Sequence, residues 1–512
     1  MAVRRALLSV YDPEGLVPLA QGLNRHSIEL WATEGTRRHL KEAHVEVHAA
    51  EELTGIGSWF GGRVKTLHPG ILGGILAPRT PEGLRELAER HLVPIELVGV
   101  NLYPFAQRYA EAPTAPDLVE MIDIGGVTLL RAAAKNHAAV TVLSSPLDYA
   151  PLIAELDALD GAISAATRRS LAAQAFARVT AYDRLIARAL GPAPATAFPD
   201  SLTFVPDPVG LRYGENPHQA AQPYLLAGPE GTPLAPYSYE RLKGDPLSFN
   251  NLLDLDAALA AVSEFDEPGA AVIKHASPCG VACGATIAEA LERAVATDPV
   301  ARYGCVIALN RPVAAADVAS LNGVFVDLLA TPDADAAARS LLGARRKLKL
   351  LRVAPPRLDA PRWEVRGAVG RLLLQEVDRR QLASKDLRLV AGTPVSPEEL
   401  RGLDFAWRVV RHAKSNAIVL AQGSRTVGIG SGQPTRVKAA ELACGVAGER
   451  ARGALLASDA FFPFPDGVEV AGRAGVRAIL QPGGSLRDPE VTAVAARYGI
   501  SMYYTGWRVF RH

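Results

Sequence analysis

A lysine and a histidine stand side by side at the end of an apolar run, in the stretch AVIKHASPCG at residues 271–280. The chain has 10 lysines against 45 arginines, so a lysine at such a place needs a reason. Arginine stays charged at any physiological pH, whereas a partly desolvated lysine can share or lose its proton. Histidine accepts a proton near neutral pH, and an adjacent ammonium favours its neutral, basic form. Lys274 and His275 therefore predict a proton-accepting site; the alternative is a core histidine beside a lysine whose stem is buried.

Neighbouring side chains of a strand point to opposite faces, so Lys274 and His275 share a site only where the strand ends and the chain turns. We expect SPCG, residues 277–280, to supply that turn. The segment SPCGVAC is similar to the Pro-Cys-x-x-Cys of zinc deaminases. Cys279 and Cys283 are one residue too far apart, however, and no His-x-Glu lies shortly upstream. We therefore reject zinc and expect no metal ligands.

Two segments of the first half suit an anionic ligand. GGRVKTLHPG places Arg63, Lys65 and Thr66 among glycines that let a ligand approach the backbone closely. In IDIGGVTLLRAAAKNH, Asp123 precedes a Gly-Gly pair that opens a helix, and the free amides of a helix start can bind an anion. The alternatives are a solvated glycine-rich loop and an ordinary helix cap followed by solvated charges that include Lys135.

Three further segments carry directional groups. NLYPF ends a buried run with Asn101 and Tyr103, although a tyrosine there is often a half-buried core residue. LRYGENPHQ, 211–219, gathers polar groups that cost free energy if they are buried without partners, and its alternative is a solvated loop. ASDAFFPFPDGVEVAG, 457–472, sets three phenylalanines beside two aspartates, which suits a flat aromatic ligand or a loop folded onto the core.

The elements that position these residues follow from an alternation of short β-branched runs with Ala/Leu-rich amphipathic stretches. LLSV, IELWAT, VEVHAA and IELVGVNLY alternate with helical patterns, which predicts a parallel sheet covered by helices. Such sheets bind ligands at the carboxyl ends of their strands, so the residues after LLSV, LWAT and VGVNLY are the first candidates. The alternation resumes in the second half, with strands expected at AAVIKH, GCVIAL, VFVDLLA, AIVLAQ, TVGIGS and VRAILQ.

Length and texture indicate several domains. A chain of 512 residues is too long for one core, and size statistics favour roughly two to four domains. GPAPATAFPD, 191–200, is typical of a linker, and a proline-rich segment suggests a softer boundary near residue 365. We therefore expect domains at 1–195, 200–365 and 366–512. The last two share an outline, with Lys274-His275-Ala276 in one and Lys414-Ser415-Asn416 in the other, which hints at a duplication.

Composition excludes several function classes. The net charge is +1 and the apolar and charged fractions are 48% and 21%, ordinary values for a globular protein without a basic nucleic-acid footprint. Four cysteines cannot make a disulfide framework, which fits a reducing compartment. We find no signal peptide and no apolar stretch of the ~18 to 20 residues that a membrane span needs. We expect a cytoplasmic protein with small-molecule ligands, no nucleic acid and no membrane.

Nine ordered motifs, from RVKTLHP to the terminal TGWRVFRH, closely resemble the bifunctional purine-biosynthesis family that joins AICAR formyltransferase to IMP cyclohydrolase. The others are NLYPF, IDIGGVTLLRAAAKNH, RYGENPHQ, KHASPCG, KSNAI, GIGSGQ and SDAFFPF. The resemblance implies an α/β fold: an N-terminal methylglyoxal-synthase-like parallel sheet domain, then two cytidine-deaminase-like α/β subdomains without zinc. It also implies 10-formyltetrahydrofolate as co-substrate, a homodimer that shares the transfer site between subunits, and room for a potassium ion.

The resemblance also assigns roles to residues. For ring closure it implies catalytic Lys65, Tyr103, Asp123 and Lys135, and nucleotide contacts at Arg63, Thr66, Asn101, Ser9, Thr33, Gly35 and Thr36. For formyl transfer it implies the catalytic residues Lys274, His275, Asn416 and Asp466. The AICAR nucleotide is expected at Arg212, Tyr213, Gly304, Asp327, Arg436, Phe461 and Arg508, with Asn251 beside the folate.

Some residues depart from the family pattern. Pro13 replaces a lysine that would neutralise phosphate, and Glu34 stands beside an expected anion, which weakens the expected phosphate contacts of the first site. Two other functions therefore stay open at this point. One is a formyltransferase with a degenerate cyclohydrolase domain, and the other is a nucleotide-binding protein without turnover.

Overall fold

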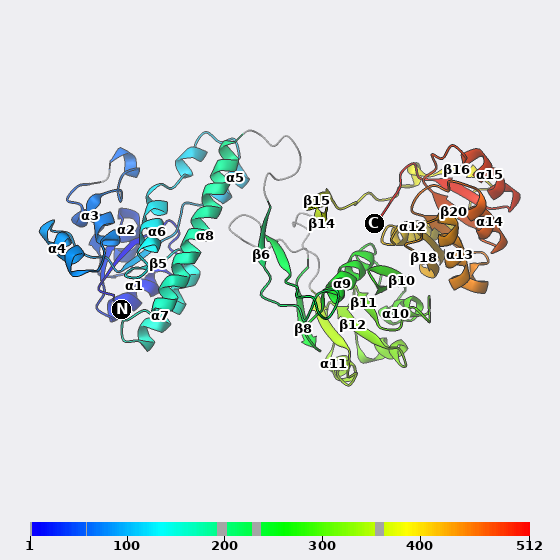
Figure 1. Ribbon diagram of the computed structural model, residues 1–512, viewed down its shortest axis with the longest axis horizontal. Helices are drawn as coiled ribbons and strands as arrows, with labels where there is room; N and C mark the ends of the chain where they lie inside the picture. The colour runs from blue at the N-terminus through cyan, green and yellow to red at the C-terminus, as the bar shows by residue number, and fades with distance from the viewer. Residues whose placement is uncertain (1–2, 58, 192–201, 228–236, 354–362) are drawn as a thin grey trace. The chain divides into compact units, whose positions relative to one another are not determined.

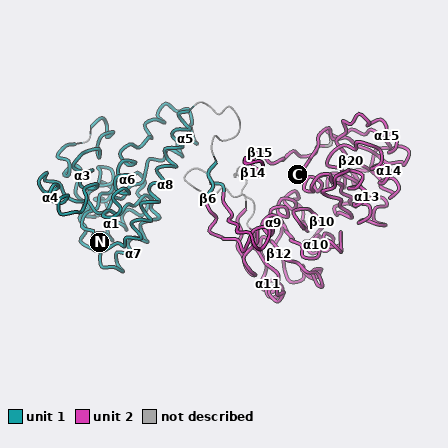
Figure 2. The backbone as a smooth tube through the Cα atoms, in the orientation of Figure 1, with its two compact units in different colours: residues 1–205, 226–233 teal, residues 206–225, 234–512 magenta. Residues whose placement is uncertain are grey.

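The computed structural model describes residues 3–57, 59–191, 202–227, 237–353 and 363–512. Contacts divide the chain into two compact units, residues 1–205 with 226–233 and residues 206–225 with 234–512 (Figures 1 and 2). All but the first residue of the expected linker, 191–200, lie outside the described residues. None of the helices described is long and apolar enough to cross a membrane.

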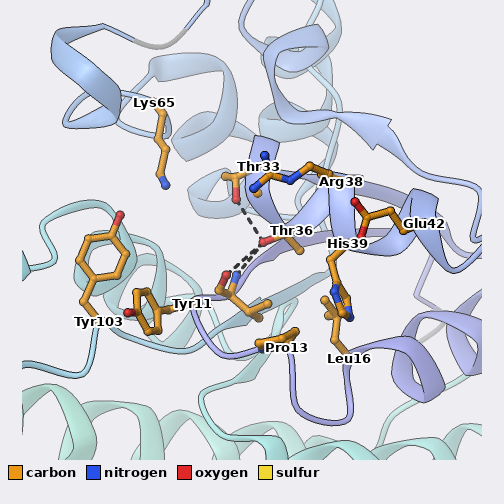
Figure 3. A pocket seen from close by; sticks show the side chains of 12 residues that line it. Tyr11, Pro13, Leu16, Thr33, Thr36, Arg38, His39, Glu42, Lys65 and Tyr103 are labelled. Carbon is orange, nitrogen blue, oxygen red and sulfur yellow. Dashed lines mark hydrogen bonds between the residues drawn. The ribbon is translucent and has the colours of Figure 1, made fainter. Parts of the chain in front are cut away.

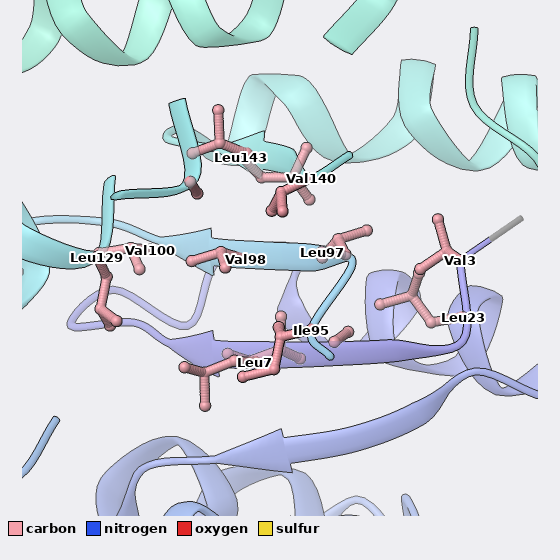
Figure 4. Packing of buried hydrophobic residues seen from close by; sticks show 14 of the residues in the cluster. Val3, Leu7, Leu23, Ile95, Leu97, Val98, Val100, Leu129, Val140 and Leu143 are labelled. Atoms are coloured by element: carbon pink, nitrogen blue, oxygen red, sulfur yellow. The ribbon is translucent and has the colours of Figure 1, made fainter. Parts of the chain in front are cut away.

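The N-terminal unit is built on a parallel five-stranded sheet of order β3-β2-β1-β4-β5. Its strands are β1 (Arg5–Ser9), β2 (Glu29–Ala32), β3 (His48–Ala49), β4 (Leu97–Val100) and β5 (Thr141–Leu143). Four of these strands fall in the runs that predict them. The buried positions of these strands are mostly apolar because both sheet faces are covered, as Leu7, Val98 and Leu143 illustrate (Figure 4).

Helices pack on this sheet, with α6 against β4 and β5, α8 against β5, and α1 against β2 and α7. The α-helices are α1 (Leu16–Arg25), α2 (Glu34–Glu42), α3 (Pro69–Leu76), α4 (Pro81–Glu89), α5 (Phe105–Glu111), α6 (Gly125–Lys135), α7 (Tyr149–Ala158) and α8 (Ala165–Leu190). Short 3₁₀ turns are η1 (Ala50–Leu53), η2 (Phe60–Gly62), η3 (Leu118–Met121) and η4 (Pro146–Asp148). This architecture agrees with the predicted parallel α/β sheet.

The C-terminal unit is organised by one mixed sheet of twelve strands, in the order β16-β21-β20-β19-β17-β18-β10-β9-β11-β12-β13-β8. One half contains β8 (Tyr239–Lys243), β9 (Gly269–Lys274), β10 (Ser277–Cys283), β11 (Cys305–Leu309), β12 (Val326–Thr331) and β13 (Lys349–Val353). The other contains β16 (Arg388–Ala391), β17 (Ile418–Gln422), β18 (Arg425–Gly430), β19 (Leu455–Ser458), β20 (Ala478–Gln481) and β21 (Ser501–Tyr504). Because the sheet runs through both expected subdomains, the boundary near residue 365 stays a prediction.

Three apolar cores cover this sheet, and alternate residues of a strand enter different cores. Ala271 and Ile273 of β9 join the core beneath α9 and α12, whereas Ala270 and Val272 join the core beneath α10 and α11. The third core lies beneath α13, α14 and α15. These helices are α9 (Phe249–Val262), α10 (Ile287–Val295), α11 (Ala336–Gly343), α12 (Pro397–Val410), α13 (Arg436–Ala447), α14 (Asp466–Arg473) and α15 (Asp488–Arg497).

Smaller elements complete the described chain. Two-stranded sheets are formed by β6 (Thr203–Pro206) with β7 (Tyr224–Ala227) and by β14 (Trp363–Ala368) with β15 (Arg371–Glu376). The 3₁₀ turns are η6 (Ala315–Leu321), η7 (Ser384–Asp386) and η8 (Gly448–Ala451).

The expectation that SPCG forms a turn is wrong, because residues 277–283 form strand β10. The chain turns two residues earlier, at His275 and Ala276, which connect Lys274 to its partner Ser277. Pro278 has no amide hydrogen to donate, and the strand tolerates it at an irregularity between Pro278 and Gly280 where the register shifts.

Candidate functional site

A cavity of about 440 Å³ opens at the carboxyl edge of the N-terminal sheet (Figure 3). Its walls come from the segments after β1, β2 and β4, the three strand ends that the sheet argument singles out. The lining residues include Tyr11, Pro13, Thr33, Gly35, Thr36, Arg38, His39, Glu42, Lys65 and Tyr103. A parallel sheet thus brings together segments that are far apart in the chain.

Two threonines join the ends of β1 and β2 beside this cavity. The Thr36 hydroxyl accepts a hydrogen bond from the Val10 amide at 3.0 Å, and the Thr33 hydroxyl donates to Ser9 Oγ at 3.2 Å. Thr33 precedes α2 but makes no side-chain hydrogen bond to the helix amides. The first amides of α2, near Gly35, therefore retain their capacity to bind an anion in the cavity.

The α2 helix contributes basic side chains that the sequence analysis missed. Arg38 and His39 line the cavity, three and four residues after Gly35, so one helix face presents them together (Figure 3). That spacing in TEGTRRHLKE is the pattern that could have indicated them. Glu34 is exposed at the helix start and is not among the lining residues, whereas Pro13 is. The charge that Pro13 cannot supply is therefore available in the same cavity from Arg38 of α2.

A second cavity, of about 370 Å³, shares Lys65 and Tyr103 with the first. The Lys65 Nζ atom lies 6.0 Å from the centroid of the Tyr103 ring. Asp123 also lines this cavity, and its Oδ1 atom accepts a hydrogen bond from the Gly126 amide at 2.6 Å. Burial raises the pKa of the Asp123 carboxyl, against the lowering effects of the Gly126 bond and the Lys65 charge.

The other expected residues of this unit take different places. The Asn101 side chain is bound to backbone, because its Oδ1 atom accepts from the Tyr11 amide at 2.5 Å and its Nδ2 atom donates to the Asp12 carbonyl at 2.6 Å. Arg63 lines the second cavity and pairs there with the exposed Glu120. The Asn101 side chain thus holds the loop after β1, and its contact with the nucleotide stays a prediction.

Thr66 and Lys135 lie outside the two cavities. Thr66 is buried, and its hydroxyl has no hydrogen-bond partner among the described residues. Lys135 is exposed at the last residue of α6, about 15 Å along the helix axis from the residues beside Asp123. The structure therefore brings Lys65, Tyr103 and Asp123 together but not Lys135.

In the C-terminal unit, Lys274 and His275 occupy the end of a tight hairpin between β9 and β10. His275 and Ala276 form a two-residue turn with φ angles of 54° and 56°, a left-handed conformation that suits glycine better than either residue. Lys274 Nζ donates to the Tyr303 carbonyl at 2.8 Å, and the His275 side chain is exposed. The turn therefore presents the imidazole at the edge of the sheet.

The same edge carries the second polar tripeptide, Lys414-Ser415-Asn416. The hydroxyl of Ser431, just after β18, lies within hydrogen-bond distance of both Ser277 Oγ and the Lys414 carbonyl oxygen, each at 3.3 Å. Because β9 ends, β10 begins, β17 begins and β18 ends at this edge, His275 and Asn416 belong to one surface of the sheet. The two similar tripeptides of the sequence, Lys274-His275-Ala276 and Lys414-Ser415-Asn416, thus lie close to each other in the structure.

Asn416 is oriented by a buried ion pair. Arg436 Nη1 pairs with Asp459, and its Nη2 atom donates to Asn416 Oδ1 at 2.7 Å. Asn416 Nδ2 donates to the Gln433 carbonyl at 2.9 Å, which leaves its second N–H for a ligand. Arg436 is only 5% exposed and Asp459 is fully buried. The Arg436 guanidinium therefore supports Asn416 instead of lying open to solvent.

A second polar chain links α9 to the strands. Asn251 Nδ2 donates to Asp327 Oδ2 at 2.6 Å, and Lys349 Nζ lies 2.7 Å from Asp327 Oδ1. Lys349 is a buried lysine that the sequence analysis did not select. Gly304 follows Tyr303, the partner of Lys274, and has a φ angle of 73°. Asn251, Asp327 and Gly304 thus adjoin the Lys274 edge.

The remaining expected residues are more exposed. Arg212 stacks on Tyr213, with its guanidinium carbon 4.7 Å from the ring centroid, and donates to the Tyr213 hydroxyl at 2.8 Å. Phe461 is 39% exposed, and Asp466 and Arg508 are also exposed. Next to Arg508, the Val509 amide donates to the Asp459 carbonyl at 2.9 Å.

The cysteines do not form a metal site among the described residues, where no group of three or more His, Cys, Asp or Glu side chains is arranged to hold an ion. Burial raises the pKa of the Cys279 thiol and raises that of Cys283 to about 12. A raised pKa disfavours the thiolate form that binds metals.

Comparison with known proteins decides the family. The family model described as AICARFT/IMPCHase bienzyme matches residues 133–445, and the model described as MGS-like domain matches residues 15–128. The chain belongs to the AICARFT/IMPCHase bienzyme family. The resemblance inferred from the nine motifs is thereby confirmed, as is the expected fold of an MGS-like parallel sheet followed by the bienzyme domain.

Relatives of this bienzyme family match over their full length. The bifunctional purine biosynthesis protein PurH of Halalkalibacterium halodurans is 44% identical over 512 residues, covering 99% of this chain and 100% of its own. PurH of Rhodospirillum rubrum is 44% identical over 527 residues, which cover 100% of this chain and 99% of the relative. A solved structure, the crystal structure of ForH, is 38% identical but covers 37% of this chain, with a TM-score of 0.33 that supports no argument about the fold.

Asp123 gives a testable consequence for this bienzyme's stability. Its pKa is raised in the folded state, so the folded unit keeps a proton over a pH range in which the unfolded chain has released it, and stability falls as pH rises through that range. Asp123→Asn keeps an acceptor for Gly126 without the buried charge. We expect a higher midpoint of thermal unfolding at pH 7, and a difference from wild type that vanishes as pH falls to about 4.

The matched control is Asp183→Asn, which changes an exposed aspartate of α8 in the same unit and is expected to leave the midpoint nearly unchanged. An Asp123→Asn protein that is less stable than wild type at pH 7 would contradict the assignment of burial as the dominant effect on this carboxyl.

Proposed function

We propose that the chain catalyses the last two steps of IMP synthesis. In the first step, a formyl group passes from 10-formyltetrahydrofolate to the amine of AICAR, which yields FAICAR. In the second, FAICAR closes its ring with loss of water to give IMP. The single observation that carries the proposal is the hairpin turn that presents His275 on the same sheet edge as Asn416. Full-length relatives named bifunctional purine biosynthesis proteins support it.

Formyl transfer needs a base because the AICAR amine is a poor nucleophile, its lone pair being delocalised into the ring and carboxamide. In the proposed step His275 removes the amine proton as nitrogen attacks the formyl carbon, and the resulting oxyanion collapses to expel the folate nitrogen, which takes up a proton. Lys274 Nζ uses one proton on the Tyr303 carbonyl, so two remain for the oxyanion.

Asn416 suits the role of a donor in this step. Its carbonyl oxygen is already bound by Arg436, so a ligand meets the free N–H of the amide. Asp466 and the nucleotide contacts proposed at Arg212, Tyr213, Gly304, Asp327, Phe461 and Arg508 complete the site, with Asn251 beside the folate. A homodimer that shares this site is part of the proposal, and sedimentation of the purified protein would test it.

Ring closure is intramolecular, so its site mainly holds a folded conformer and polarises two groups. We assign this step to Lys65, Tyr103 and Asp123, which line one cavity. The adjoining cavity, with the α2 amides and Arg38, suits the phosphate of the nucleotide. Lys135 stays a prediction, because it lies at the far end of α6.

The experiment that tests the function is to incubate the purified protein with AICAR and 10-formyltetrahydrofolate and to measure IMP. Accumulation of FAICAR without IMP would indicate a formyltransferase with a degenerate cyclohydrolase domain. AICAR binding without any folate-dependent product would indicate a nucleotide-binding protein instead.

Replacing His275 by alanine should affect one activity. We expect His275→Ala to lower the rate of formyl transfer roughly a hundred- to ten-thousandfold, the usual contribution of a positioned base, and to leave ring closure of synthetic FAICAR unchanged. Separate assays of the two steps on the purified variant measure both. Equal loss of both activities, or loss of neither, would count against His275 as the base.

Replacing Lys65 should have the opposite effect. We expect Lys65→Ala to lower FAICAR cyclisation on the order of a hundredfold or more through loss of a preorganised charge, while formyl transfer continues. Lys41→Ala, which removes an exposed lysine from α2 of the same unit, is the matched control and should cyclise normally. Unchanged cyclisation by Lys65→Ala would remove this residue from the site.

A further inference from the structure

The His275–Ala276 turn adopts a conformation that its own residues disfavour. Two-residue hairpin turns of this kind, with positive φ at both central residues, favour Asn-Gly or Gly-Gly. A side chain with a Cβ atom meets steric resistance there, and neither His275 nor Ala276 is a glycine. Such a turn persists only if surrounding contacts hold it.

One contact holds it from outside the hairpin. Asp254 Oδ1 accepts a hydrogen bond from the Ala276 amide at 2.6 Å, and the residue lies on α9, which packs against both β9 and β10. Burial raises the pKa of the Asp254 carboxyl, whereas the hydrogen bond from the Ala276 amide and the nearby His275 imidazole lower it. The carboxylate therefore faces the backbone of the turn.

The same face of α9 also contacts Asp327, a residue proposed to bind the nucleotide. Asn251 stands three residues before Asp254, so their side chains project from adjacent turns of one helix face. Asn251 bonds Asp327, and Asp327 is paired with Lys349. One helix thus contacts both the turn that carries the base and the carboxylate proposed to meet the nucleotide.

We propose that Asp254 is a positioning residue for formyl transfer. Its side chain holds the backbone of the left-handed His275–Ala276 turn, and through that backbone it fixes where the His275 imidazole stands at the sheet edge. The inference rests on the proposed function, because formyl transfer is the activity in which the imidazole acts. In this role Asp254 acts through the turn and not on the substrate or the transferred group.

Three variants separate this role from others. Asp254→Ala removes the acceptor and should lower kcat for formyl transfer roughly ten- to hundredfold, with smaller changes in KM, because a displaced base reacts poorly. Asp254→Asn retains a neutral acceptor for the Ala276 amide and should keep most of the rate. Adding Ala276→Gly to Asp254→Ala removes the steric resistance of the turn and should restore most of the loss.

Other outcomes would overturn the proposal. The proposal fails if the Asp254→Ala protein is as active as wild type. It also fails if the Asp254→Asn protein is as slow as Asp254→Ala, because the charge and not the hydrogen bond would then matter. The proposal fails as well if Ala276→Gly does not restore the rate of formyl transfer in the double variant. Asp266→Ala, at an exposed aspartate just beyond α9, is the matched control and should transfer formyl normally.

A second readout does not depend on activity. Amide hydrogen exchange of the full-length protein should be faster in the peptide that spans residues 270–283 in Asp254→Ala than in wild type, because the Ala276 amide loses its acceptor. If wild type makes no FAICAR yet exchange accelerates in the variant, the proposed function fails while the contact stands. Unchanged exchange overturns the proposal whatever the activity.

Discussion

The C-terminal unit depends on the antiparallel contact between β10 and β18. It joins six strands on each side into one sheet, with the pairing of Ala282 and Arg425 as its register. Thr426 secures it from within, because its hydroxyl accepts from the Val281 amide at 3.0 Å and lies 2.9 Å from that of Thr297. Without this contact the two polar tripeptides would lie on separate sheets, since one forms the turn between β9 and β10 and the other precedes β17.

The buried ion pair of Arg436 and Asp459 orients a neighbouring side chain, that of Asn416. Arg436 and Asp459 are both removed from water, which is costly unless each is paired and hydrogen-bonded. Their surroundings meet that requirement through Ser458, Asn416 and the Ala417 amide. The sequence-based expectation that Arg436 meets the nucleotide therefore has to accommodate a guanidinium whose terminal nitrogens are already bound.

Sequence periodicity predicts much of the fold, because alternation in strands and the spacing of helices are local properties. It locates the parallel sheet, four of its strands, and the edge at which Thr33, Tyr103 and Lys65 line a cavity. Periodicity cannot show that the Asp254 carboxylate binds the Ala276 amide, or that Lys349 pairs with Asp327. Each of these contacts joins segments that are distant in the sequence. The turn at His275 was misplaced because its residues lack the glycine that usually marks one.

The spacing of Asn251 and Asp254 on α9 has a consequence for how this chain can vary. The two contacts are made three residues apart, which is close to one helical turn, so both depend on the same face of α9. One residue inserted between them would rotate Asp254 by about 100° around the helix axis relative to Asn251, and its contact with the turn would be lost. Length changes should therefore be tolerated in the loops around this helix and selected against within its first turns.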